Sequence, residues 1–104
     1  MNLTFNCAQQ QVDDRVKQHP DGYFSDEECF DKLEEEKKEM QEALSLYHEN
    51  PSEENLKALQ TEFGDELFAI ICLANKLHFS LEECFDLMIK KNQKRAKNNY
   101  EKEE

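Results

Sequence analysis

Apolar residues recur every three or four positions along most of the chain, and this spacing predicts amphipathic helices. Polar residues fill most of the positions between them, so most of each helix would bury one face. The sequence contains two Gly and two Pro, which leaves little turn chemistry outside the loop HPDGYF. We therefore expect an all-α fold, with helices over about residues 4–18, 26–49, 53–78 and 81–98.

Helix starts are marked by capping residues. Ser25 with Glu28 and Ser80 with Glu83 match the capping box, in which a serine and a glutamate satisfy each other's backbone N–H groups. Ser52 precedes two glutamates, which the helix dipole favours in a first turn. The short links 50–52 and 79–80 then make the last three helices antiparallel neighbours.

We expect one domain over residues 1–104, because a chain of 104 residues has room for a single small core. Its core would cover about residues 23–98, and the polar tail 99–104 would be frayed. The third helix is apolar on every side around LFAIICLA, residues 67–74. A four-helix chain cannot easily enclose one of its own helices, so we predict a homo-oligomer, a dimer or tetramer. The alternative is a tightly wrapped monomeric bundle.

The acidic residues follow one geometry in two helices. At about 100° per residue, Phe30, Leu33, Met40, Leu44 and Tyr47 form one apolar stripe, and Leu56, Leu59, Phe63, Ile70 and Leu77 form another. Glu36 and Glu62 lie about 60° from their stripes, and Glu39 and Asp65 lie about 120° away in the same direction. If the two helices pack antiparallel through the stripes, these four carboxylates meet at one edge of the interface.

Gathered carboxylates cannot all stay ionised without compensation, so they either take up protons or hold a metal ion. All-oxygen ligation favours Mg²⁺, Mn²⁺ or Ca²⁺. Gly64, between the two acids of the third helix, would let a ligand or a second backbone approach closely. Glu66 falls on the apolar stripe and would pair with Lys37. The alternative for the acidic pairs is a solvated helix face.

The overall charge restricts the partners. Its formal value is −11, with 24 acidic and 13 basic residues, which argues against a nucleic-acid polymer and against an anionic membrane. No apolar stretch approaches the ~20 residues that span a bilayer. The four cysteines lack disulfide or zinc-finger spacing and a signal peptide is not apparent, so we expect reduced thiols in a cytoplasmic protein.

One basic segment stands out in the fourth helix, IKKNQKRAK. Lys91 and Arg95 share a face with Asn92 beside them, a combination suited to phosphate; the alternative is cations that complement a helix C-terminus. For a nucleobase, the candidates are Phe5, Gln9, Tyr23 and Phe24, which would equally serve core packing.

Three motifs together resemble the MazG-type nucleoside triphosphate pyrophosphohydrolases. They are EEKKE at 35–39, EFGD at 62–65 and KNQKR at 91–95, and the likeness continues through GDELFAIICLANKLHFSLEECF. It covers about residues 23–95. In one departure, Lys38 stands where many members have a small residue.

The resemblance implies an all-α, MazG-like enzyme that works as a dimer or tetramer and hydrolyses a (d)NTP to a (d)NMP and pyrophosphate with Mg²⁺, or with Mn²⁺ in its place. It implies house-cleaning or control of the dNTP pool. Its metal ligands would be Glu36, Glu39, Glu62 and Asp65. Glu35, with Glu36, would act in catalysis by orienting or deprotonating the attacking water. Lys91, Asn92 and Arg95 would bind the triphosphate.

Two alternatives remain open. A related enzyme of the same fold would act on dUTP or phosphoribosyl-ATP, and substrate profiling separates these. A non-catalytic acidic helical module would bind a protein partner, and it would show no stabilisation by Mg²⁺.

Overall fold

The computed structural model describes residues 3–103 of the backbone and side chains up to residue 97. It contains α1 (Phe5–Lys17), α2 (Asp26–Glu49), α3 (Glu53–Lys76) and α4 (Leu81–Glu103), and no strand occurs within these residues. The predicted all-α class is confirmed. Helix α4 runs beyond the expected end at residue 98 and takes in residues 99–103 of the tail that the sequence predicts to be frayed.

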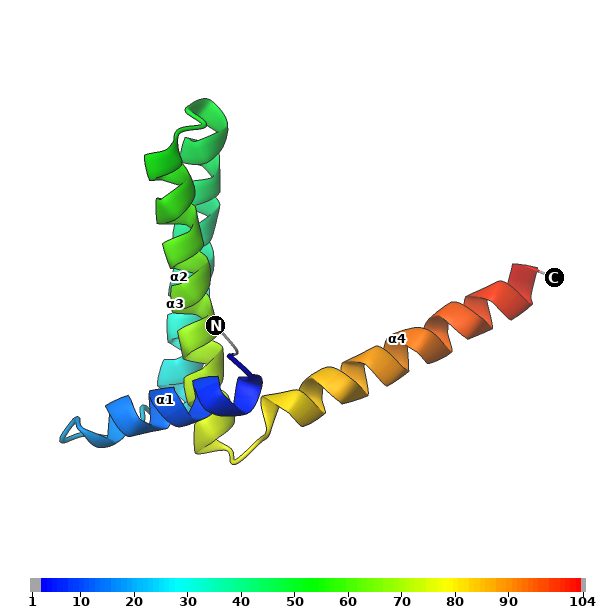
Figure 1. Cartoon of the computed structure of the whole chain (residues 1–104), viewed down its shortest axis with the longest axis horizontal. Helices are drawn as coiled ribbons and strands as arrows, with labels where there is room; N and C mark the ends of the chain where they lie inside the picture. Colours follow the sequence, from blue (N-terminus) through cyan, green and yellow to red (C-terminus); the bar gives the residue numbers. More distant parts are fainter. Residues whose placement is uncertain (1–2, 104) are drawn as a thin grey trace.

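Helices α2 and α3 form a long antiparallel hairpin (Figure 1). Ser25 and Glu28 make the predicted capping box at the start of α2. Ser52 caps α3 by accepting a hydrogen bond from the Asn55 backbone N–H at 3.1 Å. The Asn55 side chain also donates to the Asn50 carbonyl at 3.0 Å, which closes the hairpin turn. Local capping chemistry therefore sets the register of the two helices.

The faces that meet inside the hairpin differ from the predicted stripes. Glu36 and Ala43 are buried on α2, whereas Phe30 and Leu44 of the predicted stripe are 57% and 43% exposed. On α3, Phe63 of the predicted stripe is 53% exposed. Both buried faces are turned by about 50° from the predicted centre, toward the acids. Glu36 is consequently buried in the helix–helix seam, Glu39 and Glu62 are half-buried, and Asp65 is exposed at the edge of the seam.

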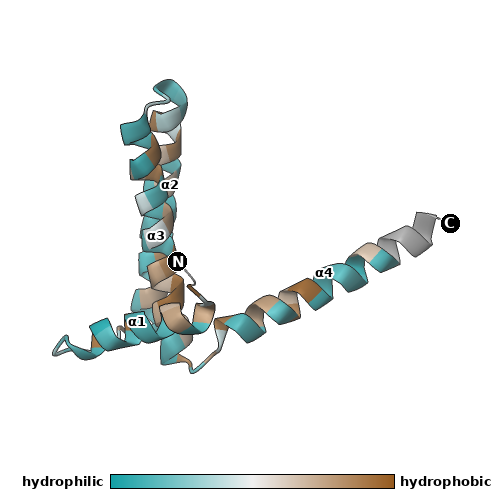
Figure 2. Cartoon of the chain, viewed as in Figure 1, coloured by the Kyte–Doolittle hydropathy of each residue, from teal (hydrophilic) through white to brown (hydrophobic). Residues whose placement is uncertain are grey.

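The stripe left outside the seam is strongly apolar. On α3 the exposed members of the stripe include Phe63 and Ile70, and Leu67 beside them is 54% exposed. Figure 2 shows apolar segments in the lower half of α3, at the start of α1 and in the first half of α4. Continuous apolar surface of this kind is typical of a protein–protein interface.

Helix α1 crosses the lower part of α3 and covers a small apolar core (Figure 1). Val12 and Val16 of α1 pack against Ile71 and Cys72 of α3. Tyr23, Ala8 and Leu81 pack around this group. The four cysteines are free, Cys29 and Cys72 buried and Cys7 and Cys84 exposed.

Helix α4 does not return along α3 as an antiparallel neighbour, so that prediction is wrong. Figure 1 shows α4 projecting away from the hairpin, and its main packing partner is α1. The change of direction occurs at His78, whose φ of 62° is in the left-handed region. The Phe79 N–H donates to the Ala74 carbonyl at 2.8 Å and the His78 N–H to the Asn75 carbonyl at 3.1 Å, which is a Schellman ending.

The extended shape agrees with the exposed apolar surface. The radius of gyration is 17.4 Å, whereas a compact domain of this length has about 13 Å. Helix α4 and the outer face of the hairpin therefore lack the contacts that a compact monomer provides. The homo-oligomer stays a prediction.

Candidate functional site

Carboxylates from both motifs meet in the middle of the hairpin. Oxygen atoms of Glu36, Glu62 and Asp65 all lie within 4.8 Å of one another. Glu39 lies one turn after Glu36 and interacts with both Glu36 and Glu62. Below, Glu36, Glu39, Glu62 and Asp65 are called the carboxylate cluster. The antiparallel packing of two helices with the same spacing of acids brings these side chains together.

Glu36 is the most buried acid of the cluster. Its side chain is only 4% exposed, and its Oε1 pairs with Lys32 Nζ at 3.1 Å. The other oxygen, Oε2, is buried and has no hydrogen-bond partner, and the same is true of Glu62 Oε2. A buried carboxylate oxygen without a partner is costly, so these atoms are suited to receive a cation.

The electrostatic strain of the cluster is evident at Glu39. Its pKa is raised from 4.5 to about 7, first by the charge of Glu36, then by partial burial, and then by Glu62. Removal of the Glu39 proton therefore places a further negative charge where two already lie. A bound divalent cation would reverse this effect, because it favours the ionised form.

The donor set fits a hard divalent cation. All the donors are carboxylate oxygens, two of them have no other partner, and three carboxylates already lie within 4.8 Å of one another. Mg²⁺ and Mn²⁺ take such oxygen ligands. The donor atoms present therefore agree with a metal site in the hairpin seam.

Two neighbours of the cluster differ from expectation. Glu66 does not pair with Lys37 in the part of the chain whose side chains are described; its Oε2 is buried without a partner, and Lys37 is exposed. A Cβ built on Gly64 would meet nothing within 4 Å. The close approach expected at Gly64 therefore does not occur within one chain.

The candidate catalytic acid Glu35 lies at the surface beside the cluster. Its side chain is 60% exposed and its Oε2 lies 3.7 Å from Lys32 Nζ. Lys32 thus contacts both Glu35 and Glu36. With Phe24, Glu28 and Asp31, Lys32 and Glu35 line a surface hollow of about 230 Å³.

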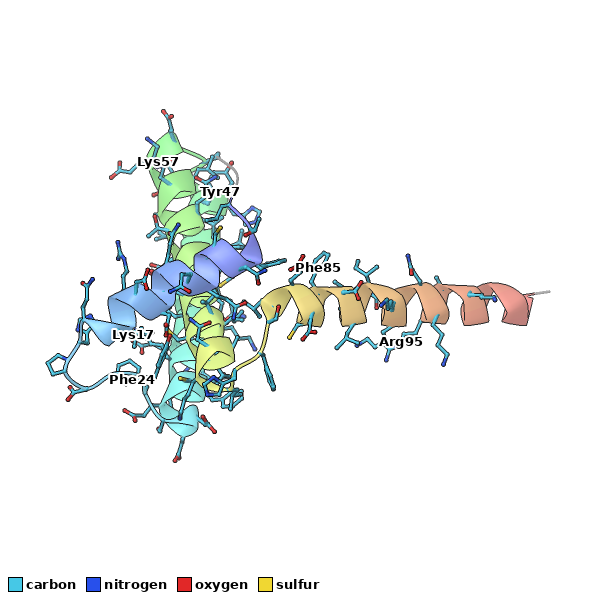
Figure 3. All side chains as sticks on the ribbon, turned by 60° about the horizontal axis from the view of Figure 1, so that its bottom comes forward. Lys17, Phe24, Tyr47, Lys57, Phe85 and Arg95 are labelled. Carbon is cyan, nitrogen blue, oxygen red and sulfur yellow. The ribbon has the colours of Figure 1, made fainter. Side chains whose placement is uncertain are left out.

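The phosphate-binding candidates are not near the cluster of their own chain. Lys91 and Asn92 are exposed at the middle of α4 and Arg95 is exposed one turn further out, on a helix that projects away from the hairpin (Figure 3). Arg95 is 14 residues from the start of α4, about 21 Å along the helix. The Asn92 side chain contacts Met88 Sδ at 3.0 Å.

The base-binding candidates are dispersed. Phe5 is 42% exposed and packs on Phe85, with ring centroids 5.8 Å apart. Phe24 is 58% exposed at the start of α2. Gln9 and Tyr23 line a groove of about 720 Å³ beside Asn75, which lies ten residues, or about 15 Å, along α3 from Asp65. The hollow at Phe24 is lined by residues of α2, and the groove at Gln9 and Tyr23 is lined partly by residues of α3.

Comparison with protein families decides the identity of the domain. The model of the MazG nucleotide pyrophosphohydrolase domain matches residues 24–100. The chain belongs to this family. The carboxylate cluster lies within the matched segment, and membership makes the protein a hydrolase of the nucleotide pyrophosphohydrolase type.

Relatives from Bacillus share the MazG fold. YpjD of Bacillus subtilis (strain 168), an uncharacterized protein, is 36% identical over 104 residues, covering 97% of this chain and 94% of its own. The crystal structure of Bacillus subtilis YpjD superposes with a TM-score of 0.76 at 32% identity, over 89% of this chain and 98% of that one. The crystal structure of the Bacillus-conserved MazG protein, a nucleotide pyrophosphohydrolase, superposes with a TM-score of 0.75 at 30% identity. The match covers 88% of this chain and 90% of that one.

One residue beside the MazG motifs, Lys32, was not identified from the sequence, and the partner predicted for another, Glu66, was wrong. Lys32 precedes Glu36 by four residues, a spacing that places an opposite charge on the same helix face. Glu66 follows Glu62 by four residues and faces the same seam. The helical spacing of four residues could therefore have identified both positions from the sequence.

No helix in the described part of the chain is long and apolar enough to cross a membrane.

Proposed function

We propose that the protein is a Mg²⁺-dependent nucleoside triphosphate pyrophosphohydrolase that converts a (d)NTP and water to a (d)NMP and pyrophosphate. The observation that carries this proposal is the carboxylate cluster, with unpartnered buried oxygens on Glu36 and Glu62. Membership of the MazG family supplies the reaction class. A role in house-cleaning or in control of the dNTP pool would follow from such an activity.

Glu36, Glu39, Glu62 and Asp65 would hold the Mg²⁺, or Mn²⁺ in its place. When bound, the cation neutralises phosphate charge and increases the acidity of water. Lys32 would keep Glu36 fixed through their 3.1 Å ion pair. These residues come from two rigid helices, so the ligands are positioned before the substrate arrives.

Glu35 is our candidate to orient the attacking water and accept its proton, with Glu36 as the second catalytic carboxylate. Glu35 is exposed next to the cluster, where solvent and substrate have access. General-base catalysis needs a carboxylate within hydrogen-bond reach of the water. No covalent intermediate is required, since direct attack by water on the α-phosphorus releases pyrophosphate.

Positive charge for the triphosphate would come from a second subunit. Lys91, Asn92 and Arg95 lie on an α4 that projects away from its own hairpin, and the outer face of α3 is exposed and apolar. A homo-oligomer that covers Phe63 and Leu67 would allow α4 of one subunit to approach the hairpin of another. Arg95 and Lys91 would then stabilise the charge on the leaving pyrophosphate.

Substrate profiling tests the function. Pyrophosphate release is measured from a panel of canonical and modified NTPs and dNTPs, with dUTP and phosphoribosyl-ATP included, with and without Mg²⁺. We expect metal-dependent turnover that is lost in Glu39→Gln and Asp65→Asn and kept in Glu34→Gln, an exposed acid on the opposite side of α2. The ranking of the panel identifies the substrate, and absence of turnover on every member would contradict the proposal.

Mixed oligomers test the shared site. Asp65→Asn and Arg95→Ala chains are each expected to be inactive. If one subunit supplies acids and another supplies cations, mixing and re-equilibrating the two chains restores part of the activity. If both sets act within one subunit, the mixture stays inactive.

A further inference from the structure

A closed hydrogen-bond network joins α1, α3 and the start of α4. Gln9 Nε2 donates to Asn75 Oδ1 at 2.9 Å and to the Phe79 carbonyl at 2.8 Å. Gln9 Oε1 accepts from the Leu81 backbone N–H at 2.9 Å. Asn75 Nδ2 donates to the Gln9 carbonyl at 2.9 Å and to Tyr23 Oη at 3.1 Å. Below, Gln9 and Asn75 with these partners are called the junction network.

All the N–H donors of the two amide side chains are used within the protein. Both N–H donors of Gln9 and both of Asn75 have partners, and each side-chain oxygen accepts one bond. Tyr23 extends the network by donating to Asp13 Oδ1 at 2.7 Å. Gln9 therefore has no free donor to offer a nucleobase, and its hydrogen bonds point to another role.

The network lies where α4 is attached. The Leu81 N–H belongs to the first residue of α4, and the Phe79 carbonyl belongs to the link before it. Beyond these bonds, α4 is held by Phe5, which packs on Phe85, and by Asn6, whose side chain donates to Glu82 at 3.2 Å. These contacts are made by α1, and Leu81 also packs against the core that includes Ile71 and Cys72 of α3. Helix α1 therefore has a large share in fixing the direction in which α4 leaves the hairpin.

The direction of α4 matters because the helix is long. Arg95 lies about 21 Å from the first residue of α4. A tilt of about 10° at Leu81 would therefore move Arg95 by roughly 4 Å, whereas productive geometry needs groups placed to about 0.5 Å. A small loosening at the junction would thus displace the cations of α4 by several times that tolerance.

We propose that Gln9 and Asn75 are positioning residues that set the angle of α4, so that Lys91 and Arg95 meet the triphosphate. They act through the Leu81 N–H and the Phe79 carbonyl and do not touch the substrate. This inference rests on the proposed function, because it assumes that the cations of α4 bind phosphate.

The test compares Gln9→Met and Asn75→Ala with Gln10→Ala in the full chain, well below the melting temperature. Gln10 is a matched control, because it lines the same groove on the same helix but donates only to Asp14 within α1. Kinetics are measured with the best substrate of the panel. Hydrogen exchange across residues 77–90 is measured without substrate, and Mn²⁺ affinity is measured by electron paramagnetic resonance.

We expect kcat/KM to fall at least tenfold in both variants, mainly through KM, and exchange at the start of α4 to accelerate. Mn²⁺ affinity should stay within twofold, because the junction lies far from the carboxylate cluster, and Gln10→Ala should resemble the wild type. The double variant should lose little more than either single variant, since both remove the same network.

Three results would overturn the positioning role: kcat/KM within twofold of the wild type in both variants, unchanged exchange at the start of α4, or an equal loss in Gln10→Ala. A fourth such result would be a loss of Mn²⁺ affinity as large as the loss of kcat/KM, because the defect would then be general. A wild-type chain without turnover contradicts the proposed function itself, and the positioning role with it.

Discussion

Glu62→Gln removes one charge from the carboxylate cluster and keeps nearly the same side-chain shape. Glu62 Oε2 is buried without a partner, and its carboxylate lies within 4.8 Å of oxygens of Glu36 and Asp65. Without a cation, the wild-type protein must tolerate this repulsion in order to fold. We therefore expect the substitution to stabilise the metal-free protein, although most substitutions in a helix seam destabilise.

The distance sets the size of the effect. Two unit charges 4.8 Å apart repel by about 3.5 kcal/mol at an effective dielectric constant of 20, and by about 0.9 kcal/mol in bulk water. Lys32 and partial protonation relieve some of this repulsion in the wild type. We expect Glu62→Gln to increase the free energy of unfolding of the metal-free protein by about 1–3 kcal/mol at pH 8.

Saturating Mg²⁺ should remove or reverse this difference in stability. A ligand at 100 times its dissociation constant stabilises the native state by about 2.7 kcal/mol. The wild type should gain about this amount, and Glu62→Gln should gain much less because one charged ligand is missing. Thermal unfolding with EDTA and with Mg²⁺, at one fixed protein concentration, measures the stability of each metal-free chain and its stabilisation by Mg²⁺. Glu34→Gln should follow the wild type in both buffers.

Two outcomes would refute the reasoning. If Glu62→Gln is less stable than the wild type in EDTA, the carboxylates do not repel one another as the geometry requires. If Mg²⁺ stabilises both chains equally, Glu62 is not part of a cation site.

Four further predictions follow from single residues. The pKa of Glu39 is raised in the folded state to about 7, so the stability that its protonated form contributes is present below about pH 4.5 and lost as the pH rises through 7. Thermal unfolding of the metal-free protein at several pH values should show this loss, and the loss should be smaller in Glu39→Gln. His78→Gly should increase the free energy of unfolding in urea by up to about 1 kcal/mol, because glycine adopts a φ of 62° without strain; a clear loss would contradict this. Gly64→Ala should increase the free energy of unfolding in urea by about 1 kcal/mol, because alanine favours the helix and a Cβ there meets nothing within 4 Å. A decrease in that free energy would indicate that a partner chain or a ligand lies against α3. Phe63→Glu should shift sedimentation toward the monomer, because Phe63 is 53% exposed on the apolar face; an unchanged profile would place the interface elsewhere.

Local features were predictable from the sequence because they depend on neighbours in the chain. The capping box of Ser25 and Glu28 and the cap at Ser52 fixed the starts of α2 and α3 at the predicted residues. The meeting of Glu36 with Glu62 and Asp65 followed from helical spacing and an antiparallel turn, both of which can be read from residue positions.

Features that depend on other surfaces were not predictable. The apolar stripes with Phe30 and Phe63 looked like the seam, but the chain buries Glu36 there and leaves both phenylalanines exposed. A hydrophobic pattern shows that a face is to be covered and does not show by which partner. The direction of α4 was missed because His78 gives no signal of a left-handed residue, a position that glycine usually occupies.

Hydrolysis of one dNTP in H₂¹⁸O, with Mg²⁺ and product analysis by mass spectrometry, tests the central claim most directly. We predict equal amounts of nucleoside monophosphate and pyrophosphate, with the ¹⁸O in the monophosphate and no reaction in Glu39→Gln. A nucleoside diphosphate with orthophosphate, or turnover that persists in the variant, would contradict a pyrophosphohydrolase centred on these carboxylates.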